Sequence, residues 1–162
     1  MAHWYIQNVK IMNKQLRASL LEICIERLNV RLSAIQKIIS ELQNALQSET
    51  KSTAGDKHET GRAMVELERE KAGQQLAQIQ AQFQILQKIK RANTGLVIGL
   101  GSVVLTDRFN YYIAISAGEI SSGGKTFFAI SPQTPIAKLL LGKTVGDVVA
   151  FRSDTFEILG VL

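Results

Sequence analysis

Residues 21–46, LEICIERLNVRLSAIQKIISELQNAL, carry the pattern that decides the fold of the first half of this chain. Apolar residues recur in this stretch at alternating spacings of four and three, which places a continuous apolar seam along one side of a helix of about seven turns. A seam of this kind and length predicts one strand of a coiled coil. Its positions are Leu21, Ile25, Leu28, Leu32, Ile35, Ile39, Leu42 and Leu46.

A second run with the same spacing occupies residues 65–86 and has one polar position. Facing residues of two antiparallel helices have numbers that add to a constant, and pairing Leu46 with Val65, and so on to Ile25 with Leu86, gives 111 at every step. The small and polar residues 48–55 lie where the chain must reverse. We therefore predict an antiparallel coiled-coil hairpin over residues 12–92, with its tip near residues 50–61. From Ile25 to Leu46 the seam rises about 32 Å. The second seam consists of Val65, Arg69, Ala72, Leu76, Ile79, Phe83 and Leu86.

The composition changes sharply near residues 91–95. Both prolines, nine of the twelve glycines and seven of the ten aromatic residues lie after Thr94. Runs of β-branched and aromatic residues predict strands near 101–106, 111–116, 126–130, 148–152 and 155–159. One short helix is predicted between them, with Thr134 as its N-cap, Pro135 at its first position and Gly142 at its end. We expect an α+β protein in which a small α+β domain over residues 93–162 follows the hairpin, with residues 1–11 as a tail belonging to neither.

Composition narrows the class of protein. The chain has 162 residues, 46% of them hydrophobic and 20% charged, which suffices for one ordinary domain or two small ones. Its longest apolar stretch, residues 95–105, is well short of the roughly 20 residues that span a bilayer, so we expect no membrane role. The single cysteine, Cys24, cannot form an internal disulfide, and the first residues lack the order of a secretory signal, which favours the cytoplasm. A net charge of +5 favours contact with nucleic acid or an acidic partner.

Two other features have structural interpretations. Residues 121–126, SSGGKT, resemble the end of a phosphate-binding loop, but Glu119 stands where that loop needs its first glycine, and a strand is predicted where it needs a helix. We predict a hairpin turn there. Cys24 lies beside the seam with no histidine or acid placed to activate it, so we expect a small buried or half-buried apolar residue.

Two carboxylates, Asp56 and Glu59, stand three residues apart at the predicted tip. An aspartate at the N-cap with a glutamate at the third helical position forms a capping box, in which both accept from otherwise unpaired helix amides. The same pair would offer hard oxygen ligands to a Mg²⁺ ion held mainly by another macromolecule. The spacing alone leaves both interpretations open.

The predicted hairpin, its Gly-Asp-x-x-Glu tip and the small C-terminal domain together resemble the Gre transcript-cleavage factors of bacterial RNA polymerase. The most specific match is residues 131–149, SPQTPIAKLLLGKTVGDVV, which are similar to that family's Ser-Pro-Ile-Ala, Gly-Lys and Asp-Val-Val pattern. The resemblance extends from about Met12 to the end. It implies an FKBP-like fold for the C-terminal domain.

The resemblance also implies an accessory factor that is not itself an enzyme. Its C-terminal domain would dock at the rim of the polymerase secondary channel, through residues such as Pro135, Ile136 and Lys143, while the hairpin enters the channel. Asp56 and Glu59 match the family's tip acids, which help to hold a second Mg²⁺ ion and orient water so that the polymerase cleaves backtracked RNA. In the family a basic surface steers the nascent RNA 3′ end, although cations on a long helix also serve solubility alone. The candidates here are Arg17, Arg27, Arg31 and Lys37.

The tip departs from the family pattern immediately after Glu59. Residues 60–63 are Thr-Gly-Arg-Ala, where the family usually has Asn-Ala-Glu-Tyr, so the tip loses an acid and an aromatic residue and gains a cation. Two alternatives therefore stay open: a regulator or inhibitor that occupies the channel without promoting cleavage, and a coiled-coil adaptor unrelated to transcription. An exposed coiled coil could also associate with a second copy of itself.

Overall fold

The computed structural model describes the backbone of residues 1–50 and 55–162 and the side chains of residues 1–48 and 59–162. The chain divides into two compact units. We call residues 28–83 the helical unit, and residues 1–27 together with 84–162 the sheet unit. None of the described helices is long and apolar enough to cross a membrane.

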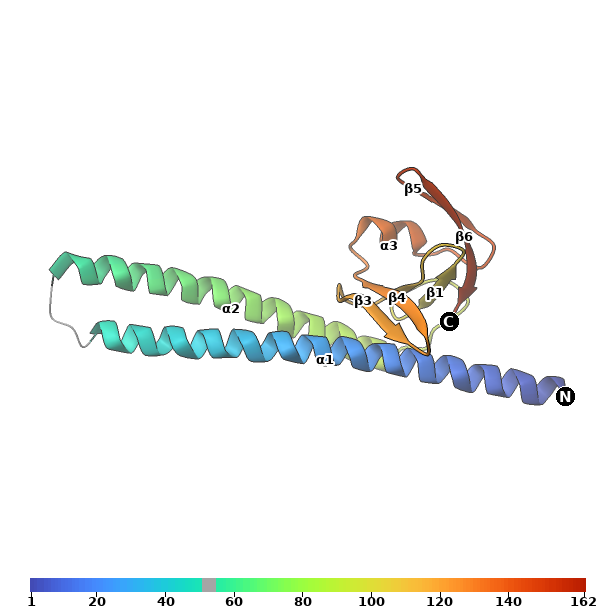
Figure 1. Ribbon diagram of the computed structural model, residues 1–162, viewed down its shortest axis with the longest axis horizontal. Coiled ribbons are helices and arrows are strands. Elements are labelled where there is room, and N and C mark those ends of the chain that lie inside the picture. The colour runs from blue at the N-terminus through green and yellow to red at the C-terminus, as the bar shows by residue number, and fades with distance from the viewer. Residues whose placement is uncertain (51–54) are drawn as a thin grey trace. The chain divides into compact units, whose positions relative to one another are not determined.

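Two long helices, α1 (Ala2–Thr50) and α2 (Gly55–Arg91), make up the first half of the chain (Figure 1). Residues 2–11, which we expected to form a separate tail, are the first turns of α1. Residues 2–50 contain neither proline nor glycine, so nothing interrupts the helix before the seam begins. The reversal predicted near residues 48–55 falls partly on residues 51–54, which lie outside the described residues.

In the helical unit, α1 and α2 lie side by side (Figure 1), and the predicted seam is the side withdrawn from water. The seam positions of this unit are buried or half-buried with one exception, the exposed Arg69. Apolar burial along the seam is therefore what stabilises this unit. Its most deeply buried residues are Leu28, Ile35, Ala72 and Ile79.

The second half of the chain forms one mixed sheet of six strands in the order β3-β4-β2-β1-β6-β5. β2 pairs with β4 in parallel, and the other neighbours are antiparallel. The chain is therefore α+β, with a long helical region followed by a small mixed sheet. The strands are β1 (Val103–Thr106), β2 (Tyr111–Ile113), β3 (Gly118–Ser122), β4 (Lys125–Ile130), β5 (Val148–Phe151) and β6 (Asp154–Val161).

Five of the six strands were predicted, and β3 was missed. β3 is rich in small and polar residues, and only Ile120 among its residues is buried, so it lacks the apolar alternation that marks a strand. β3 is a strand because its backbone pairs with β4 along its whole length. The predicted hairpin turn is confirmed, since Gly123 and Gly124 join the two strands with φ angles of 59° and 74°, a conformation that glycine adopts most readily.

The short helix α3 (Pro135–Leu140) is confirmed with its predicted cap. The Ala137 amide donates to the Thr134 hydroxyl oxygen at 3.4 Å, and Pro135 occupies a first-turn position where no amide hydrogen is needed. Gly142 follows the helix with a φ of +81°. Its amide donates to the Ile98 carbonyl at 2.9 Å, which ties the end of α3 to the segment before β1.

Alternation along the central strands gives the sheet two apolar faces. On one face, Tyr111 and Ile113 belong to a buried cluster that includes Ala137 and Leu140 of α3. Tyr112 lies between them in sequence, so its side chain points to the opposite face, where it too is fully buried. Further buried residues of that second face include Val103, Ile120 and Phe127.

The second face is covered by the parts of α1 and α2 that belong to the sheet unit. On α1, the Ser19 and Ser122 hydroxyls are 2.8 Å apart, and Arg27 Nη1 donates to the Ala117 carbonyl. On α2, Ile89 packs against Gly101, where an added Cβ would lie 3.1 Å from its Cγ2. The central strands of the sheet thus lie between α3 and the helix segments, whereas Val148 of β5 and Leu159 of β6 are more than half exposed.

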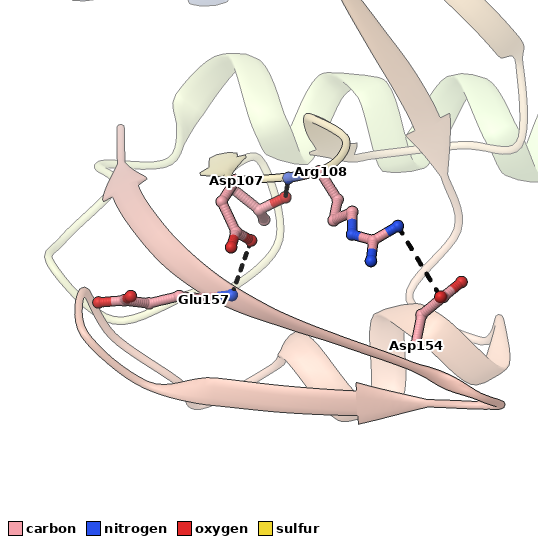
Figure 2. A network of polar contacts seen from close by, with 5 residues as sticks. Asp107, Arg108, Asp154 and Glu157 are labelled. Carbon is pink, nitrogen blue, oxygen red and sulfur yellow. Dashed lines mark hydrogen bonds and ion pairs between the residues drawn. The ribbon is translucent and has the colours of Figure 1, made fainter.

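A small polar network joins the β1–β2 turn to the last strand (Figure 2). The Glu157 amide donates to Asp107 Oδ1 at 2.9 Å, and the Asp107 amide donates to the Glu157 carbonyl at 3.3 Å. Arg108 Nη1 lies 3.9 Å from Asp154 Oδ1 in an exposed ion pair. These two hydrogen bonds, one to the Asp107 side chain and one between backbone groups, hold the turn. The exposed ion pair adds at most about 1 kcal/mol.

Candidate functional site

The predicted acidic tip lies at the start of α2. The helix begins at Gly55, so Asp56 has helical backbone and is not the N-cap residue that the capping-box pattern suggested. The Asp56 side chain lies outside the described residues. Glu59 lies in the same first turns, and its side chain is exposed.

The charge beside the tip is partly neutralised within α2. Arg62 Nε lies 3.2 Å from Glu66 Oε1 one turn further along, and both side chains are more than half exposed. Lys71 Nζ lies 3.1 Å from Glu68 Oε1 in a second exposed pair. Each pair contributes about 0.3 kcal/mol to helix stability. Glu59 has no such pairing among the described ion pairs, so its carboxylate is available to a partner.

A metal ion would need more ligands than the described part of this chain brings together. Across residues 1–48 and 59–162, no three histidine, cysteine, aspartate or glutamate side chains are gathered so that they could hold a metal ion. Mg²⁺ takes six oxygen ligands and usually keeps several waters, and it binds proteins through one or two carboxylates. Asp56 and Glu59 have the right chemistry to complete such a site, with the other ligands supplied by a partner.

The four predicted RNA-binding cations have different surroundings. Arg31 Nη1 donates to Gln82 Oε1 at 3.0 Å across the helical unit, and Arg27 is bound to the Ala117 carbonyl in the sheet unit. Lys37 is exposed and lies 4.0 Å from Glu41 Oε1. Arg17 is half-buried in the sheet unit, and its Nε is buried without an acceptor among the described residues. Of the four, Lys37 is the most available to an external partner.

The three predicted docking residues lie around α3. Pro135 and Lys143 are exposed, whereas Ile136 is half-buried and packs against the apolar cluster under α3. Two further apolar side chains beside them, Val145 and Val148, are each more than half exposed. The exposed surface near α3 therefore combines apolar groups with at least one cation.

Sequence analysis missed a group of residues on the second face of the sheet. Tyr112 is fully buried, and its hydroxyl has no hydrogen-bond partner among the described residues. Burial raises the pKa of this hydroxyl far above its usual value, the nearby Cys24 raises it further, and the Arg17 guanidinium opposes the change. Arg17 and Cys24 lie on α1, whereas Tyr112 lies in β2, about 90 residues further along the chain. Only the packing of α1 on the sheet brings them together.

Arg17 and Tyr112 border a groove of about 1010 Å³ that lies entirely within the sheet unit. One wall is the α1 segment from Lys10 to Ile25, and another is the end of α2 with the loop that follows it. Tyr112 and Val161 contribute from the sheet. A groove of this size is large enough for a small molecule.

Cys24 is confirmed as a buried, unactivated thiol. Its side chain is fully buried on the face of α1 that packs against the sheet. Burial raises the pKa of the thiol from 9.0 to about 11, although the Arg27 charge acts in the opposite direction. A protonated, buried thiol is a poor nucleophile, so Cys24 is part of the packing and not of a reactive site.

We expect Cys24 to make the stability of the sheet unit depend on pH in the alkaline range. A raised pKa means that the folded protein holds the proton more tightly, so this contribution is complete below pH 9 and is lost as the pH rises from 9 to 11. The loss is on the order of 2 kcal/mol. Urea unfolding at several pH values should show a steeper decline for the wild type than for Cys24→Ala. Equal slopes for the two proteins would contradict this assignment.

Comparison with known proteins adds no identification. No family model matches the chain, and no curated protein matches it in sequence. The function is therefore inferred from the residues and geometry described above.

Proposed function

We propose that this protein is a Gre-like factor that enters the secondary channel of bacterial RNA polymerase and stimulates cleavage of backtracked RNA. The observation that carries the proposal is the combination of a buried 4-3 seam along two paired helices with two acids at the start of the second helix. Such a helix pair is a stiff probe, and its carboxylates lie where a partner's metal centre can reach them. The factor supplies side chains to the polymerase active centre and performs no reaction alone.

The proposal includes a finer account of the fold. α1 and α2 form an antiparallel coiled coil in which facing seam residues have numbers that add to 111, so that Ile35 faces Leu76 and Leu32 faces Ile79. The burial of Ile35 and Ile79 supports this register. The bond from Arg31 to Gln82 supports it as well, because it links positions that flank the seam on the two helices. The six-stranded sheet with α3 is proposed to be FKBP-like.

Asp56 and Glu59 are proposed to act as oxygen ligands and as acceptors that orient water. When bound, the shared Mg²⁺ would polarise the phosphate or lower the pKa of the attacking water. Asp56 has helical backbone in the first turn of α2, a position at which the helix dipole favours a negative charge. Glu59, one turn further along the helix, lies on the same side of α2.

The sheet unit is proposed to dock at the rim of the channel through the surface around α3. Pro135 and Lys143 are exposed there, and the neighbouring Val145 and Val148 add apolar area that a partner could cover. Contacts at this surface would provide the free energy of binding, and the helices would bring the tip to the active centre. Lys37, which remains exposed, is the proposed contact to the nascent RNA.

A second candidate function is supported by the charges next to the tip. Arg62 follows Glu59 by three residues and is paired with Glu66. Glu66 therefore does not add to the negative charge of the tip. A tip with a weaker negative potential would hold Mg²⁺ less well. The protein would then occupy the channel and regulate or inhibit the polymerase without promoting cleavage.

The two candidates are distinguished by measuring RNA shortening in a stalled, backtracked elongation complex of the cognate polymerase with Mg²⁺. We expect the wild-type protein to stimulate cleavage, and we expect Asp56→Asn or Glu59→Gln to slow it at least about tenfold, which corresponds to ~1.4 kcal/mol. Asparagine and glutamine keep the shape of the side chains and remove the anionic ligands. The variants should still bind the complex, because docking depends on the sheet unit.

Glu70→Gln is the matched control. It makes the same chemical change at an exposed position of α2, about three turns beyond Glu59, and should cleave like the wild type. Binding without any cleavage by the wild type would establish the channel regulator in place of the cleavage factor. Failure to bind polymerase would exclude both and leave the adaptor.

A further inference from the structure

The first turns of α1 carry a cluster of exposed apolar side chains. Among the described side chains, eighteen large apolar residues are exposed, and seven of them lie in residues 1–12. Single exposed apolar residues are normal on a protein surface, but a cluster of them indicates an interaction site. The seven residues are Met1, Trp4, Tyr5, Ile6, Val9, Ile11 and Met12.

The packing of the sheet unit does not account for this cluster. The first fully buried residue of α1 is Leu20, and within residues 1–12 only Asn8 is even half-buried. Trp4 and Tyr5 are 71% and 68% exposed. Folding therefore leaves these side chains in water, and only a contact outside this segment would withdraw them from it.

Four of these side chains share one face of the helix. Residues seven apart lie on the same side of an α-helix, so Trp4 is on the side of Ile11, and Tyr5 is on the side of Met12. Consecutive residues are only roughly 100° apart around the helix axis, so the two pairs form one broad face. We call these four residues the N-terminal apolar face.

The other side of this segment is positively charged. Residues 1–21 contain no aspartate or glutamate. Lys10 follows Tyr5 by five residues and therefore lies opposite the N-terminal apolar face, whereas Lys14 follows Ile11 by three and lies at its border. Both lysines are exposed, and neither belongs to a described ion pair. Solvated lysines alone would not indicate a site, but here they accompany an exposed apolar face.

We propose that the first turns of α1 bind the surface of a membrane that contains anionic lipids. A basic amphipathic helix of this kind lies in the plane of the bilayer surface, with its apolar face among the upper parts of the acyl chains. Tryptophan and tyrosine favour this region because each combines an apolar ring with a polar group. Lys10 and Lys14 reach the anionic headgroups through their long side chains. A helix that lies on a bilayer need not span it, so the proposal departs from the expectation of no membrane role.

A second copy of this chain fits the same face less well. A coiled-coil seam through Tyr5 and Met12 would also pass through Asn8 and Gln15 at the 4-3 spacing, so half of these seam positions would be polar. The N-terminal apolar face is also broader than the narrow seam of a coiled coil. The proposal concerns the first turns of α1 and does not depend on the proposed action on RNA polymerase.

The test is binding of the full chain to vesicles of phosphatidylcholine, either alone or with about a third of phosphatidylglycerol. Trp4 is the only tryptophan of the chain, so tryptophan fluorescence reports directly on this segment. With the anionic vesicles we expect cosedimentation, a blue shift of the Trp4 emission and its quenching by brominated acyl chains. Affinity for vesicles without phosphatidylglycerol should be at least about tenfold lower, because the two lysines lose their anionic partners.

Matched variants separate the apolar contribution from the charge. Met12→Gln should weaken binding to the anionic vesicles about fivefold or more, whereas Met64→Gln on α2 should bind like the wild type. The two methionines are equally exposed, at 66% each. Lys10→Gln combined with Lys14→Gln should weaken binding about tenfold or more, and Lys88→Gln, at an exposed position of α2, should not. All of these side chains are exposed, so the melting temperatures should match that of the wild type.

Other results would overturn the proposal. Equal effects of Met12→Gln and Met64→Gln, or binding without a change in the Trp4 emission, would show that this segment does not insert. Dimers that Met12→Gln abolishes, without vesicle binding, would show a contact between two copies. Binding to polymerase that Met12→Gln weakens, again without vesicle binding, would show a docking surface for a protein. Absence of wild-type binding at millimolar concentrations of anionic lipid would exclude a membrane contact.

Discussion

Leu20→Asp is expected to lower the free energy of unfolding of the sheet unit by more than about 4 kcal/mol. Leu20 is fully buried on α1, one turn before the equally buried Cys24. The substitution removes apolar area from the second face of the sheet and buries a carboxylate among apolar side chains. The change should release α1 from the sheet and expose Tyr112 and Phe127.

Urea unfolding followed by near-ultraviolet circular dichroism measures this loss, because two of the three tyrosines, Tyr111 and Tyr112, lie in β2. Far-ultraviolet signal is less suitable, since it is dominated by the long helices. Val30→Asp is the matched control on the same helix, where the side chain is 70% exposed, and it should cost less than about 1 kcal/mol. Similar losses in both variants would contradict the packing of α1 on the sheet.

Gly101→Ala is expected to destabilise the sheet unit by roughly 2 to 4 kcal/mol. Gly101 has a φ of +86°, which costs an alanine about 1 to 2 kcal/mol. An added Cβ would also lie 3.1 Å from Ile89 Cγ2, closer than ordinary contact. The Gly101 amide donates to the Ile113 carbonyl at 2.7 Å, so the backbone cannot shift without weakening that bond.

Two variants separate the backbone cost from the contact. Gly124 has a similar φ of +74° but open space around its Cα, so Gly124→Ala should lose only the backbone part. Combining Gly101→Ala with Ile89→Ala removes the contact, and the double variant should be more stable than the sum of the two single losses predicts. Equal losses for Gly101→Ala and Gly124→Ala would show that α2 does not approach the loop closely.

Local sequence determined the helical half of this protein. The 4-3 spacing predicted which side of each long helix is buried, and only Arg69 among the seam positions of the helical unit is exposed. Helix periodicity is a local property, so it can be recognised without knowing which element the helix packs against. The α3 cap at Thr134 and the turn at Gly123 and Gly124 were predicted for the same reason, because side-chain oxygens and positive φ angles act within a few residues.

Contacts between distant residues decided the rest. β3 has too few apolar residues to be recognised alone and exists because β4 pairs with it. The tip acids were found from their spacing, but the groove was not, because Arg17 and Tyr112 come from segments that only packing brings to one place. Helix periodicity indicated that α1 is amphipathic. It could not show that α1 also packs against the sheet, because the sequence of a helix does not identify the second element that covers it.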